Sequence, residues 1–233
     1  MIRRFPLLHS AEDLAALVNE IGFLPFFQNA IPGFSIEEST PGELWFSDEA
    51  DGPWEWKGPV IERTNCAYGK FYQNKALYIS AEYFPNFANY RRDGYDFEGF
   101  YEEGFARSKD KKLMDALNRT GPVITKTLKR EAGYSGKDGL KGFDGVITRL
   151  QMQTFVLTDG IEHLTDKFGQ SYGWGVCRYA TPEQRYGEDF LAAAYALPPE
   201  ESKRKLLDHL RKLLPDADGD DLMRLLGKPA SIR

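Results

Sequence analysis

The spacing of apolar residues in the middle of the chain predicts three short helices. The first covers 108–121, SKDKKLMDALNRTG, and ends at a glycine. The second covers 121–133, GPVITKTLKREAG, in which Pro122 suits the first helical turn. The third covers 142–153, GFDGVITRLQMQ. Its buried stripe would consist of Phe143, Val146, Ile147 and Leu150.

The segment that follows the third helix alternates apolar and polar residues, which is typical of strands. Residues 154–182 therefore predict a hairpin around the polar turn DKFGQS at 166–171. Three helices followed by a two-stranded hairpin is the element order of a winged helix. In such a domain the third helix lies in the major groove and the hairpin turn reaches phosphate.

An aromatic-rich segment precedes these helices. It begins with a helix over 10–21 and continues through a stretch rich in Gly and Pro, where ELWF at 43–46 predicts a strand. If the chain is extended further on, Trp54 and Trp56 lie on one face. They could form a structural aromatic cluster or a wall on which a base stacks.

The remaining patterns complete an α+β prediction. A hairpin over 69–80 turns at Gln73 and Asn74. After Pro182 the pattern is helical again, over 183–197, 199–214 and 218–227. We therefore expect an aromatic-rich α+β subdomain at 1–103, a winged helix at 104–181 and a C-terminal helical extension at 182–233.

Composition narrows the class of protein. Hydrophobic residues make up 42% of the chain, which is sufficient for a packed core, and no apolar run reaches the roughly 18 residues of a membrane span. The first residues lack the cleavage site of a signal peptide, so a cytoplasmic protein without membrane contact is expected. The two cysteines and three histidines are far apart in sequence, which predicts no metal site and no cofactor. The oligomeric state is left open.

The charge pattern points to one segment. The whole chain has a net charge of −5, but residues 104–150 contain 11 Lys/Arg and 5 Asp/Glu. Such a segment is either a DNA-binding face or a set of ordinary solvated helix faces. If it binds DNA, the contacts would come from Lys126, Lys129, Arg130, Lys137, Lys141, Thr148, Arg149 and, in the hairpin turn, Lys167.

Two glutamines at the end of the third helix are the candidate catalytic groups. If the chain is still helical there, Gln151 shares a face with Thr148 and could contact a base, while Gln153 points about 200° away. If the chain is already extended from Leu150, both amides point to the same side and could act together. The residues could also be helix-end residues without a function.

A resemblance gives these glutamines a meaning. The segments YGKFYQNKALYISAEYFPNFANYRRD, LMDALNRTGPVITKTLKREAG and KGFDGVITRLQMQTFVLTDGIEH resemble the winged-helix family that contains the AlkZ and YcaQ bacterial DNA glycosylases. The resemblance covers roughly residues 60–180. It implies hydrolysis of an N-glycosidic bond on alkylated DNA, in which a Gln-x-Gln or Gln-x-Asp motif positions water. Gln151 and Gln153 match that motif, although the chain is shorter than such glycosylases and its motif lies in a later helix.

Three functions follow from these patterns. The protein could be a DNA glycosylase-like enzyme that flips a base into an aromatic pocket. It could instead be a DNA-binding regulator or repair accessory without catalysis. The acidic flanks also allow a winged helix that contacts other proteins.

Overall fold

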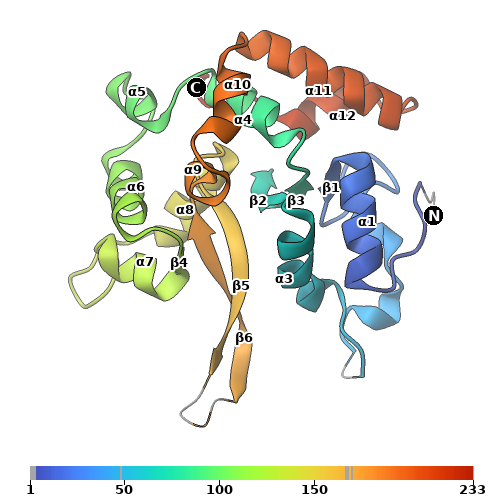
Figure 1. Cartoon of the computed structure of the whole chain (residues 1–233), viewed down its shortest axis with the longest axis horizontal. Coiled ribbons are helices and arrows are strands. Elements are labelled where there is room, and N and C mark those ends of the chain that lie inside the picture. The colour runs from blue at the N-terminus through green and yellow to red at the C-terminus, as the bar shows by residue number, and fades with distance from the viewer. Residues whose placement is uncertain (1–3, 48, 166–167, 169, 233) are drawn as a thin grey trace.

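The computed structural model describes residues 4–47, 49–165, 168 and 170–232, with the backbone alone described at 164–165 and 171–174. These residues form an α+β structure with two three-stranded antiparallel sheets, which confirms the predicted class (Figure 1). None of the described helices is long and apolar enough to cross a membrane.

The N-terminal elements surround the first sheet, in which the strand order is β1-β3-β2. They are α1 (Ala11–Ile21), β1 (Phe23–Pro25), α2 (Ile36–Ser39), the 3₁₀ helix η1 (Gly42–Leu44), α3 (Pro53–Thr64), β2 (Ala67–Tyr72) and β3 (Lys75–Ile79). The helix predicted over 10–21 is confirmed, and so is the hairpin turn. Gln73 and Asn74 have φ of 48° and 62°, the left-handed conformation that a tight two-residue hairpin requires.

Two predictions for the stretch before β2 are wrong. Residues 43–46 do not form a strand, because Gly42–Leu44 is a 3₁₀ helix. Trp54 and Trp56 do not alternate along an extended chain, because α3 begins at Pro53, which suits the first turn of a helix. The helix turns these two rings about 200° apart. Trp56 is therefore buried, while Trp54 is half-buried.

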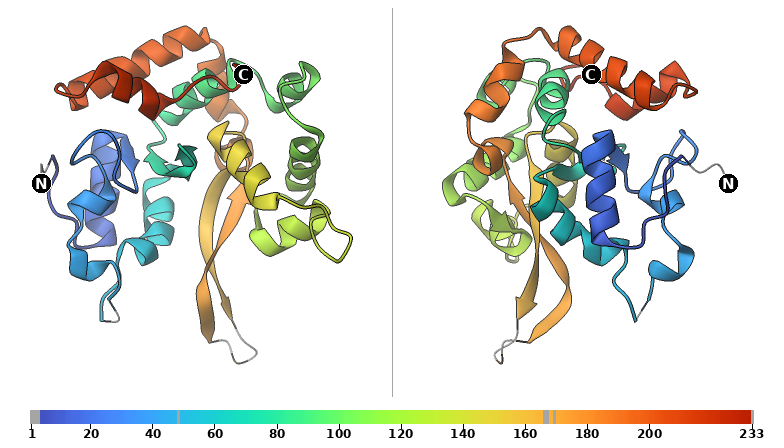
Figure 2. Two further views of the ribbon diagram at one scale, coloured as in Figure 1. Left: turned by 180° about the vertical axis from the view of Figure 1, so that it is seen from behind. Right: turned by 45° about the vertical axis from the view of Figure 1, so that its right-hand side comes forward.

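The central elements form the second sheet, in the order β4-β6-β5, and the helices beside it. They are α4 (Phe84–Arg92), α5 (Phe97–Glu102), α6 (Ser108–Thr120), β4 (Val123–Ile124), α7 (Thr125–Glu131), α8 (Phe143–Met152), β5 (Leu157–Thr165) and β6 (Ser171–Ala180). The β5–β6 hairpin is long and projects from the body of the protein in all three views (Figures 1 and 2).

The predicted helices over 108–121 and 142–153 are confirmed as α6 and α8, but the helix predicted over 121–133 is only partly right. Val123 and Ile124 are extended and pair with Tyr179 and Arg178 of β6, so α7 begins at Thr125. The sequence pattern missed this strand because two residues are too few for an alternation to be visible.

The C-terminal helices are α9 (Pro182–Tyr186), α10 (Asp189–Tyr195), α11 (Pro199–Leu213) and α12 (Gly219–Leu226). The single helix predicted over 183–197 is wrong. Gly187 has a φ of 89°, which ends α9 and separates it from α10. The other two predicted helices are confirmed.

The buried apolar residues form two clusters. One joins the first sheet and α1 to α11 and α12, so the two ends of the chain share a core. The other lies among α5, α6, α7, α8 and the root of β6. The C-terminal helices therefore stabilise the N-terminal half of the protein directly.

A pair of arginines at the end of α4 connects these parts. Arg92 is 1% exposed; its Nη2 donates to the Thr154 carbonyl over 2.8 Å, and its Nη1 forms an ion pair of 2.8 Å with Glu183. Arg91 donates through Nε to the Met152 carbonyl over 3.0 Å, and through Nη1 to the Leu226 carbonyl. The carbonyl of Met152, the last residue of α8, and the Thr154 carbonyl just beyond the helix are thus satisfied from α4.

We expect Arg92→Met to destabilise the fold by about 3–5 kcal/mol, because it leaves Glu183 and buried carbonyl groups without their partner. Urea unfolding would measure this change. The control is Arg204→Met, whose exposed ion pair with Glu201 should contribute about 1 kcal/mol or less. Similar losses for both variants would contradict the role of the buried pair.

The same ion pair predicts a pH dependence. Burial raises the pKa of Glu183, but the charge and hydrogen bond of Arg92, together with hydrogen bonds from the backbone and Thr181, lower it more in total, so the folded-state pKa lies below the ordinary value. The stabilisation is therefore complete above an unfolded-state pKa of roughly 4.3 and is lost as the pH falls below it. We expect the free energy of unfolding to fall more steeply from about pH 5 to pH 3 in the wild type than in Glu183→Gln. Equal slopes in urea unfolding would contradict this prediction.

Candidate nucleic-acid interface

Helix α8 is the centre of the candidate site. Its stripe of Phe143, Val146, Ile147 and Leu150 is buried, as predicted. The helix continues through Met152, and Gln153 still has helical dihedral angles (φ −87°, ψ −1°). The turn into the next strand occurs at Thr154, which has a φ of 67°. The extended arrangement that would align the two glutamines is therefore absent.

Both flanks of α8 are covered. On one side, Arg149 forms an ion pair with the buried Asp110 of α6, with Nε 3.1 Å from Oδ1. On the other side, the Lys70 backbone N–H of β2 donates to Gln151 Oε1 over 2.9 Å. Seen from behind in Figure 2, α8 lies between the β2–β3 hairpin and the α6–α7 pair.

A glycine makes the approach of β2 possible. A Cβ atom at Gly69 would lie 3.0 Å from Gln151 Oε1 and 2.9 Å from the Phe71 ring. The hairpin turn is also close, because the Asn74 N–H points at the Met152 sulfur over 3.3 Å. The β2–β3 hairpin is thus packed against the face of α8 that we expected to be open to solvent.

The two glutamines are both buried, and they face different surroundings. Gln151 is 2% exposed, and its Nε2 donates to the Ile147 carbonyl while its Oε1 accepts from Lys70. Gln153 is 9% exposed, and its Oε1 is without a hydrogen-bond partner among the described residues. The expectation that Gln151 could contact a base from an open face of the helix is wrong, because β2 covers it.

The part of α8 that remains open forms the floor of a depression. A hollow of about 410 Å³ lies beside the start of the helix, and one of about 530 Å³ lies beside its later turns. Both include Gly145 and Arg149, and the second also includes Asn74. Asn74 also borders a third hollow of about 230 Å³, so each hollow shares lining residues with the next. We call these three adjoining hollows the α8 channel.

The third hollow is the aromatic pocket. Its walls include the rings of Phe26, Phe27, Trp54, Tyr68 and Tyr179. The polar side chains of Gln151, Thr158 and Cys177 also line it. Burial raises the pKa of Tyr68 and Tyr179, so both hydroxyls stay neutral at physiological pH. The pocket is therefore an apolar, ring-lined cavity with a few polar groups, as ligand sites commonly are.

The α8 channel is strongly basic. None of the described residues that line its three hollows is acidic. Its basic residues are Lys70, Lys75, Arg107, Lys109, Lys141 and Arg149. A larger hollow of about 800 Å³ between α3 and the β5–β6 hairpin has the opposite character, because Asp51, Glu55 and Glu62 line it. The negative net charge of the chain is thus compatible with a local surface that attracts phosphate.

The predicted DNA contacts divide into several groups. Lys126 and Lys137 are exposed, and Lys141 and Thr148 line the channel. The other described cations are already paired: Lys129 with Asp144, Arg130 with Glu131 and Arg149 with Asp110. Lys167 lies outside the described residues. Of the two tryptophans, Trp54 lines the aromatic pocket, whereas Trp56 is buried and donates to the Asp51 carbonyl.

The sequence patterns missed four channel cations: Lys70, Lys75, Arg107 and Lys109. Arg107 and Lys109 start the basic segment, so their charge was visible. Lys70 and Lys75 flank the predicted hairpin turn, and nothing in the sequence placed that hairpin beside α8.

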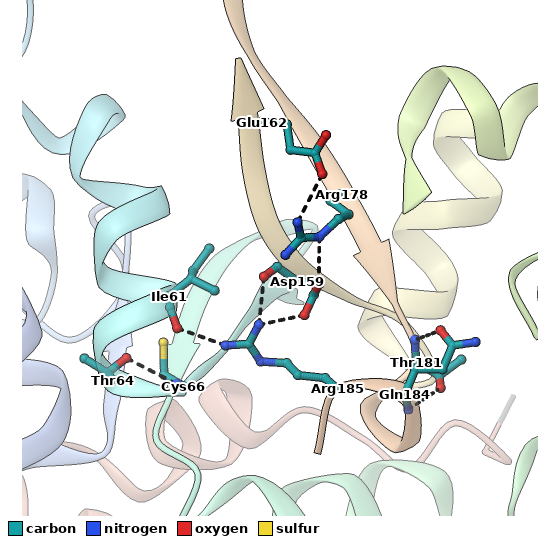
Figure 3. Close-up of polar contacts among 9 residues, drawn as sticks. All are labelled: Ile61, Thr64, Cys66, Asp159, Glu162, Arg178, Thr181, Gln184 and Arg185. Carbon is teal, nitrogen blue, oxygen red and sulfur yellow. Dashed lines mark hydrogen bonds and ion pairs between the residues drawn. The ribbon is translucent and has the colours of Figure 1, made fainter. Parts of the chain in front are cut away.

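The projecting hairpin is fixed at its root by a cluster of charges (Figure 3). Asp159 of β5 accepts from Arg178 Nε and from Arg185 Nη1, each over 2.7 Å. Arg185 also donates to the Ile61 carbonyl of α3 over 2.9 Å. This cluster holds the hairpin against the N-terminal half, next to Thr158 in the aromatic pocket. No group of three potential metal ligands occurs among the described residues.

Comparison with known proteins gives one family match, which covers most of the chain. A family described as AlkZ related matches residues 8–227. The chain belongs to the AlkZ-related family. The match extends well beyond the segments that carry the resemblance in the sequence. No curated protein and no solved structure is significantly similar to the chain.

The ion pair at α8 gives a prediction that separates stability from DNA contact. Arg149→Met should destabilise the free protein by about 3 kcal/mol, because Asp110 would remain buried without its partner. Thermal and urea unfolding would measure the loss. Lys141→Met, which removes an exposed channel cation, should change stability by no more than about 0.5 kcal/mol. If Arg149→Met left the free energy of unfolding unchanged, the ion pair with Asp110 would not stabilise the fold, and the arginine would be free to bind phosphate.

Proposed function

We propose that the protein binds DNA along the α8 channel. The observation that carries this proposal is a row of three adjoining hollows with six basic and no acidic side chains among their described lining residues. Phosphate contacts from Lys and Arg supply most of the affinity of DNA-binding proteins. Membership in the AlkZ-related family supports a function connected with DNA.

We further propose that the segment from α6 to β6 is a winged helix. Its order of helix, short strand, two helices and hairpin agrees with that architecture, and β4 completes the sheet of the hairpin. In this proposal the positive charge of α7 and of the channel faces the sugar-phosphate backbone.

Hydrolysis of an N-glycosidic bond is the second candidate function. One observation favours it: Gln151 and Trp54 line the same aromatic pocket, so a base held there would lie near an amide. Both amide atoms of Gln151 already make hydrogen bonds, and Gln153 does not line that pocket. The geometry therefore supports DNA binding better than catalysis by a pair of glutamines.

The DNA-binding proposal predicts a steep dependence on salt. We expect the logarithm of the DNA association constant to fall linearly with the logarithm of the salt concentration. The variant Lys70→Ala/Lys109→Ala/Lys141→Ala should reduce the magnitude of this slope by up to about 3, since each lost phosphate contact reduces it by about 0.9. Fluorescence anisotropy with a labelled oligonucleotide measures both. The control is Lys205→Ala/Arg211→Ala/Lys212→Ala on α11, which removes the same charge from exposed positions. Equal losses in both variants would contradict a specific channel.

The enzymatic alternative predicts release of a base. Incubation with DNA that contains methylated purines should liberate free base, and Gln151→Ala should reduce the rate at least about 100-fold if the amide positions water. The control is Gln28→Ala, whose side chain is not part of the channel. No base release by the wild type, or full activity in Gln151→Ala, would refute this role.

A further inference from the structure

We propose that the α8 channel holds a single unpaired DNA strand, one base of which enters the aromatic pocket. This inference rests on the proposed DNA binding and specifies its substrate class. Four observations carry it: the covered flanks of α8, the concave shape of its open face, the basic channel walls and the ring-lined pocket at one end.

The flanks of α8 prevent it from entering the major groove of a duplex. An α-helix with side chains is about 10–12 Å wide and the major groove is about 12 Å wide, so one helix with free sides fills it. Arg149 joins α8 to α6 through Asp110, and Gln151 joins it to the backbone of β2. Neighbouring elements pack at about 8–10 Å between axes, which makes the combined surface too wide.

The open face of α8 also does not protrude. Of the helix residues that line the two hollows described above, Gly145 is exposed, and Thr148, Arg149 and Met152 are half-buried in the floor. The Lys70 ammonium lies 3.4 Å from Thr148 Oγ1, so the wall from β2 reaches over this floor. A recognition helix needs a convex face to reach base edges, whereas this face is concave and suits a strand that lies along it.

The walls of the channel have the composition of a single-strand site. Proteins that bind single strands combine a basic groove along the backbone with aromatic rings on which bases stack. Here Arg107, Lys109 and Lys141 lie at one end, and Lys70 and Lys75 lie at the other, beside the pocket. From Gly145 to Met152 the floor extends about 10 Å at the helical rise.

The pocket at the end of the channel has the size for one base. Its volume of about 230 Å³ is below the roughly 300–1,000 Å³ of sites for drug-sized ligands, so it has no room for a base pair. A base reaches it only after it has left its partner. This step costs a duplex a few kcal/mol and costs a single strand much less.

The first test compares strands. Fluorescence anisotropy would measure the affinity of the full chain for a labelled single strand, for its blunt duplex and for a duplex with a central single-stranded gap. We expect the single strand and the gapped duplex to bind at least about 10-fold more tightly than the blunt duplex, with a salt slope near −0.7 per phosphate contact. Equal or tighter binding of the blunt duplex overturns this inference and leaves DNA binding intact. No binding of any probe at low salt overturns both proposals.

The second test asks whether a base occupies the pocket. The probes are the same single strand and a strand of equal length that lacks all bases. We expect the wild type to lose about 5- to 150-fold in affinity for the strand without bases, since a stacked base contributes that much. Two variants should bind both strands nearly alike. Trp54→Leu removes a ring from the pocket wall, and Ala76→Leu narrows the pocket.

The control for this test is Trp45→Leu, because Trp45 packs on Trp54 at 5.8 Å but does not line the pocket. It should keep the wild-type preference for bases. Thermal unfolding of each variant identifies any that fail to fold. If the wild type binds both strands equally, or if folded Trp54→Leu and Ala76→Leu both keep the full preference, the pocket does not hold a base.

Discussion

The hydrogen bonds that Arg91 and Arg92 make to the end of α8 are the constraint on which the rest of the structure depends. The last carbonyls of any α-helix lack partners within the helix, and here the carbonyls of Met152 and, two residues later, Thr154 accept from the buried side chains of Arg91 and Arg92. The two guanidinium groups satisfy these carbonyls and extend to Leu226 and Glu183. They thereby position α8 against both the N-terminal sheet and the C-terminal helices. Because a buried arginine without its partners is strongly unfavourable, this arrangement has few alternatives.

The candidate site follows from that positioning. Once α8 is held at its end, β2 packs along it, and Gly69 allows the backbone to approach the Gln151 amide. The same packing brings the rings of the N-terminal loops to β5 and β6, where they enclose the aromatic pocket. The charges of the hollows differ accordingly: only basic charged residues line the three hollows of the α8 channel, whereas Asp51, Glu55 and Glu62 outnumber Lys57 in the hollow on the other side of Trp54. A protein with negative net charge can therefore present a surface suited to DNA.

The Gln-x-Gln string illustrates the limits of a motif. The string matches the motif that the sequence resemblance implied, but it lies on a continuous helix, so its two amides diverge. One amide borders the pocket and the other is buried elsewhere. A motif contributes to a site through the positions of its side chains, and these positions depend on whether the backbone is helical or extended.

The sequence by itself determined the elements that depend on local interactions. The apolar stripe of α8, the helix over 10–21 and the Gln73–Asn74 turn were all predictable, because each is encoded within a few neighbouring residues. The break at Gly187 and the two-residue strand β4 were missed, because they depend on one backbone conformation and on pairing with a distant strand. Only the tertiary structure decided that β2 covers Gln151, that Arg149 pairs with Asp110, and that Lys70 and Lys75 join a channel with Arg107 and Lys109. These contacts join residues tens of positions apart, and such pairings are set by the packing of whole elements, which leaves no periodic trace in the chain.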